Sequence, residues 1–444
     1  AKTTGEAYAR LIPDQALSVG DPRYVPLDRV RGGINIAESL HKRVKSQEAE
    51  LVREGDGSAR DSLNFARLLL TGHSGCGKTT ELFRLRELLE NDGFSVVYYD
   101  AQEEFDLNND IGWWNVILEM IWQLDEQLSS GANAIKIPEG PKNDAATWIA
   151  RTIITNKKQT DVSAELSTEF GVEAGLPFFV KAKMLLKSLV KTGSTYLKTV
   201  ETEAERRPGV LLGALSKIVS SINDQLKAKG RMGLVIIVDS LEKIPYRTDA
   251  GGITSHAAIF IHGGDKLKSP PCHLLYTLPL TLLNHNPVGQ IFPDKPIVMP
   301  VVHVINREGN PDEVGISIMT DLLDKRVDSA LLEQGVARQL ALASGGQVRD
   351  FVRLAREAAG RFGKTITLAD ANAAIQDFIN YYDDLYAARY HDALVSVHQE
   401  HLLPRGDFDS ELIDKLLVLP YKNGESWYAL HPCVLNGPRL RELR

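Results

Sequence analysis

The feature that most constrains this chain is a glycine-rich segment, residues 72–80, with the sequence GHSGCGKTT. It follows a strand-like apolar run, residues 66–71, and leads into a helical pattern of leucines at Leu82, Leu85 and Leu88. In this setting the glycines let the backbone curl so that successive N–H groups point inward, and the helix N-terminus adds partial positive charge. The segment therefore predicts a phosphate-binding loop.

Each residue of this loop is expected to contact a nucleoside triphosphate. The loop residues are Gly72, His73, Ser74, Gly75, Cys76, Gly77, Lys78, Thr79 and Thr80. We expect Lys78 to reach the β- and γ-phosphates and the Thr79 hydroxyl to be a ligand of Mg²⁺. Cys76 is either small enough to fit the loop or, because a helix N-terminus lowers the pKa of a thiol, open to oxidation.

A second apolar run supplies carboxylates for the same chemistry. Residues 234–238 are Leu, Val, Ile, Ile and Val, and Asp239 ends the run. The carboxyl ends of strands in an open α/β sheet face the ligand, so Asp239 is expected to hold Mg²⁺ through water. Glu242 is the candidate for orienting or deprotonating the attacking water, with a solvated loop charge as the alternative.

These motifs resemble those of AAA+ and STAND-type ATPases. GHSGCGKTTEL resembles a Walker A motif, VIIVDSLEK resembles a Walker B motif, and residues 344–349, SGGQVR, resemble the sensor 2 element of origin-recognition-type initiators. The Asp-x-x-Glu spacing is similar to that of NACHT-like STAND proteins. The resemblance implies ATP as the nucleotide and a five-stranded core followed by a helical lid, often with a winged helix.

Three further site residues depend on that resemblance. Thr277 lies where such families place a polar sensor 1 residue, although a threonine at a strand end is common. Arg349 would point at the nucleotide from the first turn of a helix, where its planar fork suits phosphate oxygens; an ordinary surface arginine is the alternative. Arg31, in a Val-Arg-Gly-Gly turn, is a weaker candidate for a nucleotide contact.

Strand-like runs at five places predict the fold class. They span residues 67–71, 94–100, 234–239, 273–277 and 297–304, with helical stretches between several of them. This order predicts an α/β, P-loop NTPase fold with a parallel five-stranded sheet and helices on both faces. The expected domains follow in chain order: an N-terminal helical segment, 1–65; the ATPase core, 66–305, with a helical insert at about 130–230; a helical lid, 306–365; and a winged-helix-like domain, 366–444.

The insert and the C-terminal domain raise the question of nucleic acid. Within the insert, residues 130–165 are expected to be irregular because they carry Gly, Pro and Asn. Lysines between 181 and 198 have no acidic residue among them, which fits either a solvated helix face or a surface for nucleic acid or an acidic partner. Asn423-Gly424 between two strand-like runs predicts the hairpin of the winged helix, which binds DNA or else holds the lid or a partner.

The composition of the chain argues against several other classes of protein. The net charge is −7, which does not favour a general polyanion binder, and three widely spaced cysteines do not favour a disulfide framework or a zinc site. The apolar runs are much shorter than the roughly 20 residues of a membrane span. We therefore expect a cytoplasmic protein with no membrane partner.

Taken together, the sequence predicts a Mg²⁺-dependent switch that binds and slowly hydrolyses ATP. Such sites usually take an arginine from a neighbouring subunit, so we expect a homo-oligomer or a partner protein; Arg206, Arg307 and Arg326 are the candidate donors. The resemblance of the loop and of the terminal NGxxWYxxHP stretch to bacterial conflict proteins implies a defence or signalling role. A DNA-engaging ATPase of the initiator or transposition-helper type is the alternative.

Overall fold

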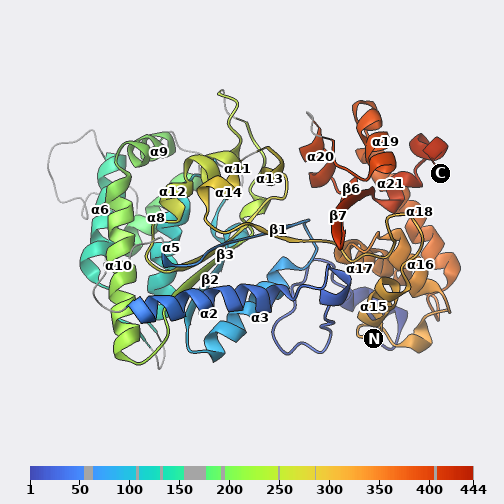
Figure 1. The fold of residues 1–444 in the computed structure, drawn as a ribbon, viewed down its shortest axis with the longest axis horizontal. Coiled ribbons are helices and arrows are strands. Elements are labelled where there is room, and N and C mark those ends of the chain that lie inside the picture. The colour runs from blue at the N-terminus through green and yellow to red at the C-terminus, as the bar shows by residue number, and fades with distance from the viewer. Residues whose placement is uncertain are drawn as a thin grey trace.

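The computed structural model describes residues 1–54, 64–106, 110–130, 134–154, 177–191, 196–248, 251–285, 287–404 and 408–443. Figure 1 shows an elongated molecule with a sheet and its helices at one end and a smaller group of helices with a hairpin at the other. Helix α1 (Thr4–Arg10) packs against α17 (Val348–Ala359) of the smaller group, so the N-terminus lies far from the sheet. Among the described residues, no helix is both long and apolar enough to cross a membrane.

A parallel five-stranded sheet forms the centre of the larger part, as the sequence predicted. Its strands are β1 (Arg67–Gly72), β2 (Ser95–Asp100), β3 (Leu234–Asp239), β4 (His273–Leu278) and β5 (Ile297–Met299). They lie in the order β2-β3-β4-β1-β5, with every neighbouring pair parallel. Strand β4 therefore separates the strand that precedes the glycine-rich loop from the strand that ends at Asp239.

Helices cover both faces of this sheet, which confirms the predicted fold class. Helices α2 (Ile36–Glu54) and α3 (Lys78–Asn91) pack on one face, where Leu68, Leu70 and Ile237 are buried beneath them. Helices α5 (Trp113–Leu128) and α10 (Pro208–Ala228) pack on the other face, on side chains such as Leu69 and Ile236. Because both faces are covered, the strands are mainly apolar, with most of their polar residues near the strand ends.

The fifth strand ends earlier than predicted. β5 stops at Met299, before Pro300, whereas the apolar pattern extends to residue 304. After β5 the chain forms backbone hydrogen bonds with three segments outside the sheet. Val301 N donates to Pro420 O, Val302 N donates to Gly346 O and His303 N donates to Val30 O. Residues 301–304 are as buried as a strand, but their backbone partners lie outside the sheet, so periodicity alone does not distinguish them from one.

The insert between β2 and β3 is helical. Besides α10, it contains α6 (Glu139–Ile154), α8 (Phe178–Lys191) and α9 (Tyr196–Arg206). The expectation of an irregular stretch is wrong for residues 139–154, because Gly140 and Pro141 lie in the first turn of α6, where proline costs no hydrogen bond. Residues 155–165 of that expected stretch lie outside the described residues.

Two groups of helices follow the sheet. α15 (Glu313–Asp324), α16 (Val336–Ala343) and α17 bury a common core with α1. The C-terminal group contains α18 (Leu368–Leu385), which begins with a Thr367/Asp370 capping box, α19 (His391–Glu400), α20 (Asp409–Asp414) and α21 (Pro432–Leu435). The antiparallel hairpin of β6 (Val418–Asn423) and β7 (Glu425–Leu430), turning at Gly424, completes a winged-helix-like arrangement.

Short helical segments connect these elements. They are α4 (Ala101–Glu104), α11 (Ser255–Ala257), α12 (Gly264–Leu267), α13 (Leu282–His285) and α14 (Val288–Ile291), a π-helical turn at Ala258–His262, and 3-10 turns at Asp28–Val30, Leu241–Lys243, Ser329–Leu331, Ala388–Tyr390 and Pro438–Leu443.

Candidate nucleotide site

The glycine-rich loop joins β1 to α3 in a conformation that requires glycine. Gly75 and Gly77 have φ values of +80° and +98°, in the left-handed region that side chains rarely adopt. A Cβ added to Gly75 would lie 2.5 Å from the Cβ of Arg349. Gly77 is the N-cap of α3, so the free N–H groups of the first turn of α3 open toward the loop.

Lys78 is held inside the loop by a carboxylate from the neighbouring motif. Its Nζ lies 2.9 Å from Glu242 Oε1, and it also donates to Gly72 O at 3.0 Å and His73 O at 3.1 Å. The two side chains are only 5% and 9% exposed. Burial alone would raise the pKa of Glu242, but the adjacent Lys78 ammonium reverses this, so the pKa lies below its usual value and Glu242 is ionised.

The predicted Mg²⁺ ligands also meet. Thr79 Oγ1 donates to Asp239 Oδ2 at 2.7 Å, and Tyr98 OH, from β2, donates to the same oxygen at 3.0 Å. Asp239 is buried, and this burial, with the negative charge of Glu242, raises the pKa of its carboxyl group. A hydroxyl and a carboxylate beside a phosphate loop are the ligands that Mg²⁺ takes in triphosphate sites, where phosphate oxygens and water complete its shell. The residues therefore fit Mg²⁺.

The turn after Asp239 directs Glu242 back toward Lys78. Ser240 has φ +64°, an unusual conformation for a residue other than glycine, and Ser240 N donates to Asp239 Oδ1 at 2.7 Å. Thr277, buried at the end of β4, accepts a hydrogen bond from Leu241 N at 3.3 Å. Thr277 thus contacts the turn that carries Glu242.

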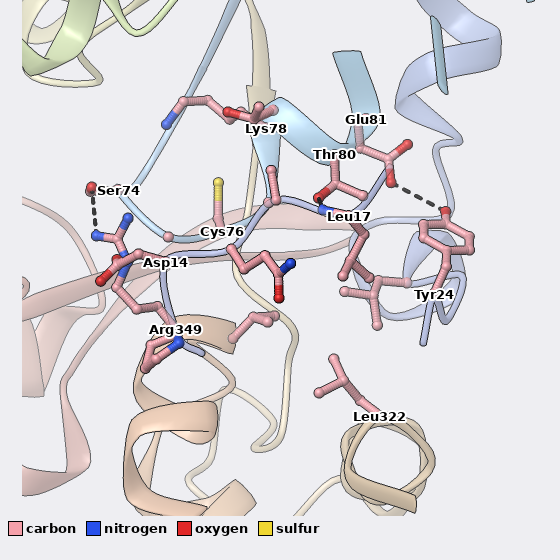
Figure 2. Close-up of a pocket in the computed structure, with 18 of the residues that line it drawn as sticks. Asp14, Leu17, Tyr24, Ser74, Cys76, Lys78, Thr80, Glu81, Leu322 and Arg349 are labelled. Carbon is pink, nitrogen blue, oxygen red and sulfur yellow. Dashed lines mark hydrogen bonds and ion pairs between the residues drawn. The ribbon is translucent and has the colours of Figure 1, made fainter. Parts of the chain in front are cut away.

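A pocket opens between this loop and the N-terminal segment (Figure 2). Leu17 N donates to Thr80 Oγ1 at 3.1 Å, and Tyr24 OH donates to Glu81 Oε1 at 3.2 Å, so residues 13–27 lie along the start of α3. Arg31 is buried and donates to Cys76 O at 2.7 Å. The pocket encloses about 140 Å³, less than the roughly 300 Å³ at which ligand pockets begin. A whole nucleotide therefore requires the walls to separate.

The sensor 2 candidate contacts the loop but is already paired. Arg349 NH1 donates to Ser74 Oγ at 2.9 Å, and its Nε lies 2.6 Å from Asp14 Oδ1 of the N-terminal segment. Gln347, the N-cap of α17, donates from Nε2 to Ser74 O at 2.7 Å. Figure 2 shows Arg349 and Asp14 together at the rim of the pocket, so the pair closes one side of it.

The loop also contacts the C-terminal hairpin. His73 is buried and its Nε2 donates to Val418 O, the first residue of β6, at 3.0 Å. Burial and the nearby Lys78 ammonium lower the pKa of His73 to about 3, so the ring is neutral at pH 7. Tyr421 OH, from the same strand, donates to Gly345 O at 2.6 Å. One strand thus touches both the phosphate loop and the turn before α17.

Sequence reasoning missed four of these partners. They are Tyr98, Gln347, Asp14 and the His73–Val418 contact. All depend on segments far apart in the chain, and only Tyr98, a hydroxyl-bearing residue near the carboxyl end of β2, carried a signal.

The three arginines predicted as candidate donors lie in different parts of the structure. Arg326 lines the same pocket and donates to Arg23 O and Leu322 O within its own chain. Arg307 is about half exposed and lies 3.6 Å from Glu425. Arg206 lies in the insert, at the end of α9.

No family model matches this chain, and no curated protein matches it. Several solved structures are similar. The Orc1 protein of Aeropyrum pernix in complex with DNA is 14% identical, with 94% of this chain and 96% of that chain covered and a TM-score of 0.37. Cdc6p of Pyrobaculum aerophilum is 12% identical (96% and 98% covered, TM-score 0.35), as is a RuvB mutant of Thermotoga maritima (85% and 79% covered, TM-score 0.31). At sequence identities this low, the similarity concerns the fold alone.

Proposed function

We propose that this chain is a Mg²⁺-dependent ATPase of the AAA+ type that acts as a molecular switch. One observation carries the proposal: two polar pairs from distant motifs meet at the carboxyl ends of β1 and β3. Lys78 contacts Glu242 at 2.9 Å, and Thr79 contacts Asp239 at 2.7 Å. A phosphate-binding lysine, a metal-binding hydroxyl, a metal-binding carboxylate and a carboxylate for water are the groups that phosphoryl transfer to water requires.

The Lys78–Glu242 pair gives the switch a physical basis. A γ-phosphate in the loop competes with Glu242 for the Lys78 ammonium. When Lys78 turns to the phosphate, the pKa of Glu242 rises, because the cation that lowered it has moved away, and Glu242 becomes a stronger base. Its second oxygen, Oε2, is buried with no hydrogen-bond partner among the described residues, so it has a lone pair for the attacking water. Bound Mg²⁺ supplies charge neutralisation beside Thr79 and Asp239.

The contacts of the C-terminal hairpin favour a role in coupling over a role in DNA binding. β6 faces the ATPase core, where Val418 O and Pro420 O accept hydrogen bonds from His73 and Val301. Closing the loop on phosphate would therefore move the hairpin. A DNA-engaging ATPase is the second candidate, since helices with a hairpin form the winged-helix shape. A salt-dependent affinity for duplex DNA would favour this candidate. The absence of a gel shift at low salt would exclude it.

The experiment is to measure ATP binding and phosphate release in the parent and three variants. Lys78→Met should lose ATP binding while keeping its circular dichroism spectrum. Glu242→Gln should bind ATP but release phosphate about 10²–10⁴-fold more slowly, the usual contribution of a general base. Lys42→Met, an exposed lysine on α2, is the matched control and should match the parent.

Two outcomes would contradict the proposal. Micromolar ATP binding by Lys78→Met, about −8 kcal/mol, would show that the loop does not grip the phosphates. A parent that binds ATP but never releases phosphate would instead be a non-hydrolysing scaffold. Sizing the parent with and without a non-hydrolysable ATP analogue tests the proposed assembly into homo-oligomers. The finer role, a regulatory part of a bacterial defence or signalling system, is supported only by the motif resemblance.

A further inference from the structure

A second large hollow lies in the helical insert, away from the phosphate loop. It is a groove of about 940 Å³ between α6, α9 and α10, at the end of the molecule opposite the C-terminal hairpin (Figure 1). Trp148 and Ala214 are buried at its floor. The volume lies within the range of about 300–1,000 Å³ that is usual for small-molecule sites.

Small residues on α10 create this groove. Gly209 and Gly213 lie one turn apart on the helix face that lines it, and a Cβ at either position would meet no atom within 4 Å. Glycine inside a helix costs about 1 kcal/mol relative to alanine, and here it leaves open space in place of packing. The hollow is thus a property of the residues on the helix face.

Most of the positive charge in the groove has no ion-pair partner among the described residues. Five cationic side chains line it against two carboxylates, Asp144 and Glu203. The cationic residues are Arg151 on α6, Lys198 and Arg206 on α9, and Arg207 and Lys217 on α10 and its N-cap. Only Arg207 is paired, with Glu203 at 3.3 Å; the other four make no ion pair or side-chain hydrogen bond among the described residues. This concentration is unusual in a chain whose net charge is −7.

We propose that this groove binds a small ligand carrying several phosphate groups. Cations from three helices line one cavity, so they surround a compact anion from several directions, and the hydroxyls of Thr147 and Thr199 lie among them as donors. The arrangement favours a small ligand over single-stranded nucleic acid. Among the described residues of the lining, Trp148 is the only aromatic one, and it is 7% exposed, so these residues give bases no stacking platform.

Calorimetric titration of the full-length chain with inorganic tripolyphosphate tests this site. The titration uses the Lys78→Met background, so that the phosphate loop contributes no binding. We expect one tripolyphosphate per chain. The double substitution Arg151→Glu and Lys217→Glu should weaken binding at least tenfold, because charge-assisted hydrogen bonds are lost and repulsion is added. Gly213→Phe should also weaken binding, because Gly213 lines the groove, a Cβ there meets no atom within 4 Å and the ring would occupy part of the open space.

Arg43→Glu, which reverses an exposed charge on α2, is the matched control and should leave the affinity unchanged. Circular dichroism checks that each variant is folded; if Gly213→Phe does not fold, the exposed charge reversals still decide the question. Three results would overturn the proposal. They are the absence of binding in the Lys78→Met background, an equal loss with Arg43→Glu, and tighter binding of a 20-nucleotide single strand that the groove variants weaken in the same way. Because the titration uses a chain without Lys78, its failure is independent of the proposed ATPase activity.

Discussion

The buried ion pair between Lys78 and Glu242 gives a prediction whose size follows from the structure. Both side chains are less than a tenth exposed, and their charged atoms are 2.9 Å apart. Removing one partner of a buried pair leaves the other charge uncompensated and costs about 3–5 kcal/mol. Lys78 keeps two carbonyl acceptors when Glu242 is lost, so we expect about 3 kcal/mol for Glu242→Gln and a similar loss for Lys78→Met.

The double variant is the informative one. Once Lys78→Met has removed the ammonium, Glu242→Gln removes the charge that was left unpaired, so the second substitution should restore stability instead of lowering it further. We expect the double variant to be less stable than the parent by clearly less than about 3 kcal/mol, where simple addition would give about 6 kcal/mol, so the coupling should exceed about 3 kcal/mol. Urea unfolding followed by circular dichroism, without nucleotide, measures the free energy of unfolding of the parent, the two single variants and the double variant.

A surface pair provides the comparison. Lys45 and Asp92 are 2.8 Å apart but 54% and 29% exposed. A cycle through Lys45→Met and Asp92→Asn should give a coupling of about 1 kcal/mol or less, because solvent screens the pair. If the Lys78 and Glu242 substitutions add within about 0.5 kcal/mol, the two groups do not form a coupled buried pair, and the competition with phosphate proposed above is refuted.

Three further predictions follow from single contacts. Asp14→Asn should speed the association of a fluorescent ATP analogue in stopped flow, because Arg349 loses the ion pair that closes the pocket; an unchanged rate would show that the pair is no barrier. Gly346→Ala should destabilise the fold by more than about 2 kcal/mol in thermal unfolding, since its Cβ would lie 1.8 Å from Val302 O, and a near-neutral effect would contradict that packing. His73, with a pKa of about 3 when folded and about 6.5 when unfolded, takes up a proton only on unfolding, so stability should fall by roughly 1.5–2 kcal/mol between pH 6.5 and 5, and His73→Gln should lose less over that interval.

The parts of the fold that the sequence predicted are those specified by neighbouring residues. The loop, the strand before it and the carboxylate that ends β3 follow from local patterns. To predict that Glu242 lies close to Lys78, the order of the parallel strands is needed as well. That order places the carboxyl ends of the strands at one edge of the sheet.

The parts that could not be predicted depend on partners distant in the chain. Residues 301–304 are Val, Val, His and Val, a strand-like run, and their hydrogen bonds to Pro420, Gly346 and Val30 reveal that this run lies outside the sheet. Asp14 lies in a stretch without periodicity, so nothing local indicated its pairing with Arg349. In α6, the pair Gly140-Pro141 is typical of a turn but also of the start of a helix, and the sequence alone does not distinguish the two.

The path of residues 301–303 has a consequence for dissecting the protein. Their three backbone N–H groups each donate to a different part of the chain, and the ring Nε2 of His73 donates to Val418 O. A chain cut before residue 418 would leave the amide of Val301 and the ring of His73 as buried donors facing nothing, beside newly bared apolar surface. Residues 418–444 therefore stabilise the part of the chain that carries the glycine-rich loop, and truncation before residue 418 should yield aggregates instead of a smaller folded protein.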